Sequence, residues 1–153
     1  MLKQPSVKPH QIENKYELLR DYEIEVAGLN IIVPKFFRYD GASIPSVAWQ
    51  LTFSPFHPDV MLPSLVHDWL FYIHQTDRET TDDIFYELLR KNKVSYLKAT
   101  AMWAAVRAGG GLFWDNDKED TEMLKKLCKK VRNRANYEGY QFPSEIKQLC
   151  CPN

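Results

Sequence analysis

The chain has 153 residues, a length that fits one domain and is sufficient to bury a hydrophobic core. Hydrophobic residues make up 44% of the sequence and charged residues 26%, and the formal net charge is zero. This composition excludes a disordered chain or a strongly basic protein. The overall charge gives no reason to expect nucleic acid or an anionic membrane as a partner.

The cysteines and the chain start bear on the cellular compartment. Cys128, Cys150 and Cys151 do not form the even, spaced set of a disulfide-stabilised protein, so we expect free thiols in a reducing cytosol. The first residues lack the apolar core of a signal peptide, and no uncharged apolar run is long enough to span a bilayer. We therefore expect neither Sec-dependent export nor a membrane span.

The first quarter of the chain favours β-structure. Residues 1–15 are polar and contain two prolines, which predicts a loosely attached arm before a single globular domain at 16–153. Alternating apolar and acidic side chains at 22–26 are typical of a half-buried strand, and turn residues follow at 27–30. A second β-rich run covers 31–37. These patterns predict a hairpin or a small antiparallel sheet.

Two helices are expected to form a tight hairpin in the middle of the chain. Pro63 suits the first turn of a helix, which would run to about His74. Thr76 and Glu79 have the spacing of a capping box, in which two side chains each satisfy a free backbone donor. The second helix would therefore start almost where the first ends.

Two more helices are expected in the C-terminal half. The third starts after Ser95 and stops at 109–111, and the fourth covers about 117–135 within an extension at 115–153. In a chain of zero net charge, a basic helix face favours a solvated surface over a nucleic-acid patch. The fourth helix has such a face, made of Lys125, Lys126, Lys129, Lys130, Arg132 and Arg134. The sequence predicts an α+β fold, with a small N-terminal antiparallel β-sheet or hairpin packed on a bundle of about four α-helices.

The apolar segment at 65–73 carries His67 and Asp68 in its middle. Burying ionisable groups is costly unless each has a partner. At the helical rise, His67 lies roughly 11 Å before the turn of the hairpin and Asp82 roughly 9 Å beyond it, so the two can face each other. Asp82 shares a helix face with apolar residues and is expected to point inward, whereas Asp83 is expected to point to water.

Three interpretations of this cluster stay open. Arg78 lies four residues before Asp82, within reach of an ion pair, and is expected in the same interior. The cluster can be a structural network in which Arg78 neutralises the acids. His67 oriented by a carboxylate can act as a general base. His67, Asp68 and Asp82 together can also bind a divalent metal that activates water.

Other candidates come from a loop and from the third helix. Asp40 and Ser43 can add a carboxylate and a hydroxyl to the cluster, although turn formation is the favoured role. Ser43 lacks the Gly-x-Ser-x-Gly context of a serine nucleophile. Trp103 and Arg107 are spaced to lie on one helix face and can line a pocket; for Trp103 packing is favoured, and Arg107 can pair with a buried acid.

Four segments of the chain form an ordered set of motifs. They are Val33-Pro34-Lys35-Phe36 with Tyr39–Pro45, then His67–Phe71, then Arg78, Asp82 and Phe85, and then Met102–Arg107 with Gly110. In this order they resemble the pattern VPxGF…DxASxP, HDxLY, R…aD..F and Y.AVR..G of the family called domain of unknown function 1353, over about residues 22–114. The chain departs from that pattern at Lys35, where a small residue is usual, and at Phe71 and Trp103, where tyrosine is usual.

The resemblance implies a phage or prophage origin, because the family is found mainly there, but it supplies no reaction. It supports a recurrent polar set of Asp40, Ser43, His67, Asp68, Asp82 and Arg107. The leading hypothesis is a hydrolase-like protein, in which His67 is base or metal ligand, Asp68 and Asp82 orient it or bind metal, and Asp40 is a second acid. The alternative is a non-enzymatic phage accessory or tail-associated virion protein, with other phage proteins as partners and a purely structural network. The expected location is the host cytoplasm during infection, or the virion.

Overall fold

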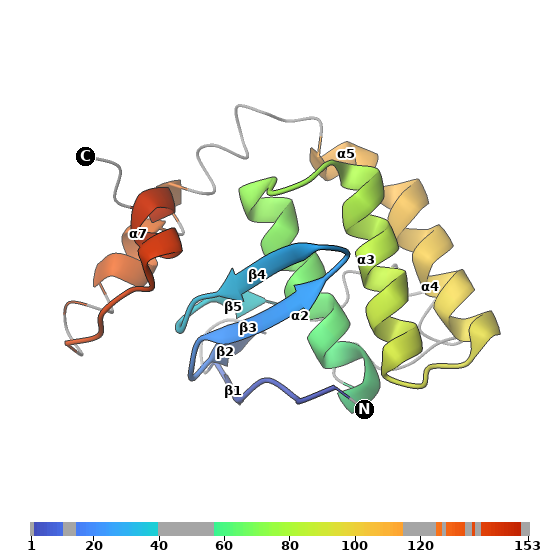
Figure 1. Cartoon of the computed structure of the whole chain (residues 1–153), viewed down its shortest axis with the longest axis horizontal. Coiled ribbons are helices and arrows are strands. Elements are labelled where there is room, and N and C mark those ends of the chain that lie inside the picture. The colour runs from blue at the N-terminus through green and yellow to red at the C-terminus, as the bar shows by residue number, and fades with distance from the viewer. Residues whose placement is uncertain are drawn as a thin grey trace.

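Two small antiparallel sheets form the N-terminal part of the fold, and helices form the rest of the described chain (Figure 1). This α+β arrangement confirms the predicted fold class. The coordinates are those of a computed structural model, which describes residues 2–10, 15–39, 57–114, 125–126, 128–133, 136 and 139–150. No helix within these ranges is long and apolar enough to cross a membrane.

The predicted hairpin consists of β3 (Tyr22–Val26) and β4 (Leu29–Val33). The two strands pair antiparallel, with Tyr22 opposite Val33 and Val26 opposite Leu29. The two residues between them, Ala27 and Gly28, have φ angles of 51° and 73°. Two successive left-handed residues match the twist of the flanking strands, which is why this short connection forms a hairpin.

A second sheet has the strand order β1 (Val7–Pro9), β2 (Tyr16–Leu18) and β5 (Arg38–Tyr39). Strand β1 lies within the segment that the sequence predicts to be a loose arm, and it pairs with β2. In the middle strand, the Glu17 carboxylate is buried and accepts a hydrogen bond from Arg38 Nε at 2.9 Å. Lys8 of β1 lies 3.2 Å from the same carboxylate. One buried acid thus joins all three strands.

Phe36 has a left-handed backbone, with φ 73°. A side chain at this φ is unfavourable. The Phe36 ring is buried against Val131 and meets the Tyr140 ring edge-on at 5.6 Å, which offsets that cost.

The first long helix, α2 (Pro58–Ile73), begins at Pro58 and not near Pro63. Pro58 occupies the first helical position, which proline favours. The His57 ring caps the helix by accepting a hydrogen bond from the Asp59 amide at 3.3 Å. Pro63 lies inside the helix. Both prolines are compatible with a helix start, so the sequence pattern did not identify the correct one.

The second long helix, α3 (Arg78–Lys91), is capped by Asp77 and not by Thr76. Asp77 Oδ1 accepts a hydrogen bond from the Thr80 amide at 2.9 Å, and its Oδ2 accepts one from the Thr80 hydroxyl at 2.7 Å. These hydrogen bonds lower the pKa of Asp77, because they stabilise its charged form. The predicted capping box is thus wrong by one residue, but the helical hairpin it implied is present.

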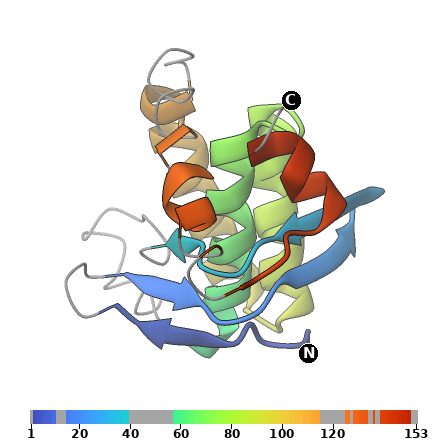
Figure 2. The ribbon, with the colours of Figure 1, turned by 90° about the vertical axis from the view of Figure 1, so that its left-hand side faces the viewer.

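The remaining helices are α4 (Tyr96–Gly109), α5 (Gly111–Trp114) and α7 (Ser144–Cys150). Ser95 precedes α4 as predicted, and α4 ends at Gly109. Figure 2 looks onto the C-terminal helical segments, which lie in front of α2. Between α5 and α7, residues 128–133 are helical, and Cys128 and Val131 are buried on their inner side.

Cys128 and Cys150 form a disulfide bond, contrary to the expectation of free thiols. The two residues are 22 positions apart, and they meet because the C-terminal segments return to the same core cluster. Spacing along the sequence carries no signal of that return. On the outer side, the basic residues of this helical segment are exposed, as a solvated face predicts; among the described ones these are Lys125, Lys126, Lys129, Lys130 and Arg132.

Helix α2 lies between the sheets and the helices α3 and α4 (Figure 1). On one side, Trp69 meets the ring of Phe37 edge-on at 5.1 Å. On the other side, α2 packs along α3, and α3 packs along α4, with Phe85 and Met102 in a second buried cluster. Polar side chains that point between α2, α3 and α4 are therefore removed from bulk water and need partners from one another.

Glu17 is expected to make the fold acid-sensitive. Burial alone would raise its pKa, but hydrogen bonds and charges from Arg38 and Lys8 lower it below the ordinary 4.5. Because the folded pKa is the lower one, the stabilisation is present above pH 4.5 and is lost as pH falls through the folded pKa. We expect Glu17→Gln to lower the free energy of unfolding near neutral pH by about 1–2 kcal/mol and to flatten its fall in acid.

Urea denaturation at a series of pH values measures this effect. Glu25→Gln is the matched control, because Glu25 is an exposed glutamate of the neighbouring hairpin. An acid-induced loss of stability that is equally steep in wild type and Glu17→Gln would contradict the assignment.

Candidate functional site

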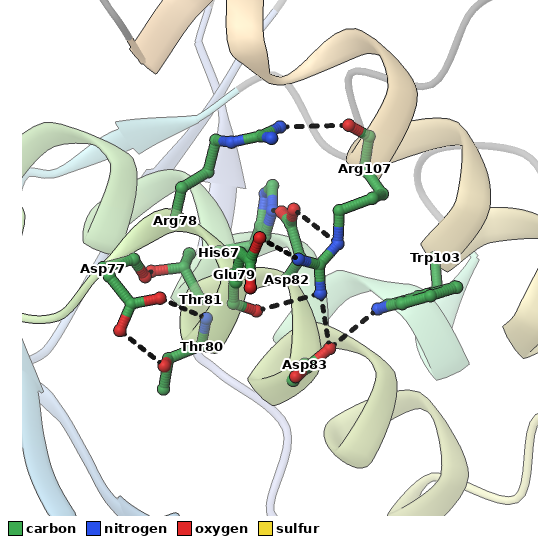
Figure 3. A network of polar contacts seen from close by, with 10 residues as sticks. All are labelled: His67, Asp77, Arg78, Glu79, Thr80, Thr81, Asp82, Asp83, Trp103 and Arg107. Carbon is green, nitrogen blue, oxygen red and sulfur yellow. Dashed lines mark hydrogen bonds and ion pairs between the residues drawn. The ribbon is translucent and has the colours of Figure 1, made fainter.

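His67 of α2 and Asp82 of α3 form a buried pair at the centre of the helical layer (Figure 3). His67 Nε2 lies 2.9 Å from Asp82 Oδ1. The Asp82 side chain is fully buried, and His67 is 9% exposed. The prediction that these two residues face each other, with Asp82 and not Asp83 pointing inward, is confirmed.

The His67 ring is held by aromatic neighbours as well as by Asp82. The ring of Phe71 lies 4.5 Å away between centroids, and the ring of Phe85 lies 5.0 Å away. Because a carboxylate oxygen can only accept, Nε2 carries the hydrogen in this contact. His67 has no further hydrogen bond in the described part of the chain, so Nδ1 is the nitrogen left to exchange a proton.

Arg107 of α4 approaches Asp82 from the opposite side. Its Nε lies 3.4 Å from Asp82 Oδ2. Both atoms are fully buried and neither makes a hydrogen bond to another described residue, so the contact is an ion pair without hydrogen-bond geometry. A buried carboxylate needs a compensating charge. Arg107 supplies it, and His67 supplies the hydrogen bond.

Arg78 does not neutralise Asp82, contrary to the prediction. Its Nη1 donates a hydrogen bond to the backbone carbonyl of Arg107 at 3.0 Å. That carbonyl belongs to the last turn of α4, where carbonyls lack a partner within the helix. The spacing of four residues places Arg78 on the correct side of α3. The neighbouring helix end offers its guanidinium a better acceptor.

Asp83 has a role that the sequence did not predict. Its side chain is 64% exposed, as expected for an outward residue, yet Oδ1 accepts hydrogen bonds from Arg107 Nη2 at 2.7 Å and from Trp103 Nε1 at 3.0 Å. The Arg107 guanidinium also lies over the Trp103 ring, 5.1 Å from its centroid. Trp103 therefore does more than pack. Two features of the sequence could have indicated these contacts of Asp83. They are the adjacent acids Asp82 and Asp83 on one helix, and Trp103 and Arg107 four residues apart on the next helix.

Asp68 points away from the His67–Asp82 pair. Neighbouring helical residues are rotated by about 100° from each other, and Asp68 is half-buried on the side of Tyr39. Burial and then the charge of Asp68 raise the pKa of the Tyr39 phenol. The expected metal ligands His67, Asp68 and Asp82 therefore do not converge. No group of three or more His, Cys, Asp or Glu side chains among the described residues is arranged to hold a metal ion.

Asp40 and Ser43 lie outside the described residues. Tyr39 is the last described residue before them; it is buried at the end of β5, and its phenolic oxygen has no hydrogen-bond partner among the described residues. Tyr39 packs in the same buried cluster as Leu65 and Trp69 of α2, so β5 ends beside α2. Asp40 follows Tyr39 directly in the chain.

The chain belongs to the family described as "Protein of unknown function (DUF1353)", which matches residues 16–106. It is similar to the protein named "Uncharacterized protein y4jT" of Sinorhizobium fredii (strain NBRC 101917 / NGR234), with 34% identity over 96 residues. These residues are 62% of this chain and 29% of the relative, so the chain spans less than a third of that protein's length. No solved structure matches the chain significantly. The matched range includes His67, Asp82 and Asp83 and ends one residue before Arg107.

Replacing Asp82 is expected to destabilise the protein far more than replacing Asp83. Asp82→Asn leaves the Arg107 charge without its buried partner, which costs about 3 kcal/mol of unfolding free energy. Asp83→Asn is the matched control, and because Asp83 is largely exposed it should change stability by no more than about 1 kcal/mol. Chemical denaturation of the two variants measures both values. Equal losses would show that Asp82 is not the charge on which the helix packing depends.

Proposed function

We propose that this protein is a hydrolase-like enzyme in which His67 is the general base and Asp82 its orienting carboxylate. The observation that carries the proposal is the contact between His67 Nε2 and the fully buried Asp82 Oδ1, at 2.9 Å, with no second hydrogen bond on the ring among the described residues. A histidine held in this way has a fixed tautomer and a free basic nitrogen.

The proposed step begins with a water molecule at His67 Nδ1. The imidazole takes one proton from the water, and the hydroxide oxygen forms a bond to the electrophilic atom of the substrate. The bond to the leaving group then breaks, and the proton on Nδ1 passes to that group. Asp82 stabilises the imidazolium in between, through the hydrogen bond at Nε2.

Arg107 sets the charge balance of this step. In the resting site of the proposed step, Arg107 faces the carboxylates of Asp82 and Asp83, and His67 is the neutral base. Proton uptake adds one positive charge, which lies directly against the Asp82 carboxylate. Asp83 and Trp103 act as positioning residues, because they hold the guanidinium that faces Asp82.

Asp40 and Ser43 belong to the proposal as groups that act on the substrate, whereas Asp68, which points away from the His67–Asp82 pair, takes no part in the proton transfer. Asp68 lies on the side of α2 where β5 ends, and Asp40 follows β5 in the chain. We assign Asp40 the role of second acid and Ser43 that of a hydrogen-bond donor. A metal-assisted reaction is the weaker version, because His67 and Asp82 bond to each other and leave only the histidine's second nitrogen and one carboxylate oxygen for an ion.

The test is a comparison of hydrolysis rates for wild type and His67→Gln. Purified protein is screened against ester, amide, phosphodiester and glycosidic substrates, and any activity found is measured in both. We expect His67→Gln to lower kcat by at least about 100-fold, the usual contribution of a general base. His10→Gln, which changes a histidine outside the site, should retain wild-type activity.

The competing function is that of a non-enzymatic accessory or virion component with a purely structural network. The near-complete burial of His67 and Asp82 favours it. Under this function, no substrate is hydrolysed and His67→Gln changes stability alone. Mass spectrometry of purified phage particles would then detect the protein as a component, whereas the enzyme predicts its presence in infected cells without enrichment in particles.

A further inference from the structure

We propose that Arg78 binds an oxyanionic group, a carboxylate or a phosphate, on the ligand of this site. The inference rests on the proposed function in one respect: it names the chemical class of the ligand that His67 would act on. The binding claim itself depends only on the surroundings of Arg78.

The Arg78 guanidinium makes a hydrogen bond to α4, and several of its N–H donors are not used in that bond. In the described part of the chain it makes one hydrogen bond, from Nη1 to the Arg107 carbonyl at 3.0 Å. Arg78 is half-buried, and none of its nitrogens is fully buried without a partner. A guanidinium has five N–H donors. Figure 3 shows the one contact, from the Arg78 guanidinium to the Arg107 carbonyl. The remaining donors of this half-buried side chain are available to a ligand.

The two arginines of the site have different surroundings. Arg107 lies against the carboxylates of Asp82 and Asp83 and against the Glu79 carbonyl, so its charge is already compensated. Arg78 has no carboxylate partner among the described residues; its one acceptor is a neutral carbonyl. Of the two arginines, Arg78 is therefore the one whose positive charge can attract an anionic ligand.

Two glycine residues lie beside the Arg78 guanidinium. A Cβ at Gly110 would lie 3.4 Å from Arg78 Nη1 and 3.2 Å from the ring of Phe71, and a Cβ at Gly111 would lie 3.9 Å from the same nitrogen. A larger side chain at either position would crowd the guanidinium. Both glycines follow α4 directly, where its end meets Arg78.

Phe71 connects Arg78 to the proposed base. The ring that would touch a Cβ at Gly110 is the same ring that contacts His67 at 4.5 Å, and on its other side it meets Trp114 edge-on at 4.8 Å. Arg78 and His67 thus both lie near the Phe71 ring. A ligand whose oxyanion binds Arg78 can lie along Phe71 with its next atoms toward His67.

The planar guanidinium fork matches the two oxygens of a carboxylate or a phosphate, and a lysine at the same place cannot bind both in this geometry. The probes are therefore inorganic phosphate and acetate, each compared with chloride at the same ionic strength. The readouts are the melting temperature and the NMR resonance of the Arg78 Nε–H group.

For wild type we expect phosphate, acetate or both to raise the melting temperature above the chloride value and to shift the Arg78 resonance. Arg78→Gln should lose this increment, measured against its own chloride baseline, and Arg78→Lys should retain only part of it. Arg132→Gln, which removes an exposed arginine far along the chain, should retain it in full. The response to the two probes tells which oxyanion the site prefers.

The inference is overturned if wild type shows no increment over chloride, or if Arg78→Gln keeps it. An equal loss in Arg132→Gln would also overturn it, because that result indicates general charge screening. His67→Gln separates the two proposals, since it should abolish hydrolysis and leave the increment intact. An increment in a wild-type protein without any hydrolytic activity would refute the enzyme and keep the anion site.

Discussion

The burial of the Asp82 carboxylate is the constraint on which the helical part of this protein depends. A charged group without solvent contact must be compensated locally. One oxygen of Asp82 meets His67 from α2, and the other faces Arg107 from α4. Helix α3 therefore has a partner on each side, and the axial positions of the three helices are set together. A shift of one turn in either neighbour would leave Asp82 uncompensated.

Much of this centre could be predicted from local patterns. The apolar stripe of α3 determines which of two adjacent acids points inward, and the short link to α2 determines that His67 and Asp82 lie at similar heights. The capping residue was wrong by one position, and the start of α2 was placed at Pro63 and not at Pro58. Neither error mattered for the pair, because the stripe and not the cap sets the orientation of Asp82.

Features that depend on distant segments could not be predicted in the same way. Spacing of four residues favoured Arg78 as the counter-charge of Asp82. Arg107, 25 positions after Asp82, occupies that place; the sequence indicated that it can pair with a buried acid but not with which one. Asp83 was correctly expected to be exposed, but its bonds to Trp103 and Arg107 require knowledge of how α4 lies on α3. The Cys128–Cys150 disulfide has the same origin, since the helical segments that bring the two thiols together meet only in the folded chain.

The proposed chemistry requires that His67 carry its hydrogen on Nε2, toward Asp82, and keep Nδ1 basic. NMR of protein labelled with ¹⁵N in its histidines reports the tautomer directly. We predict the Nε2–H tautomer for the neutral ring in wild type, with a slowly exchanging hydrogen, and loss of that preference in Asp82→Asn. A neutral ring protonated on Nδ1, or a tautomer that Asp82→Asn leaves unchanged, would contradict the assignment of His67 as a base oriented by Asp82.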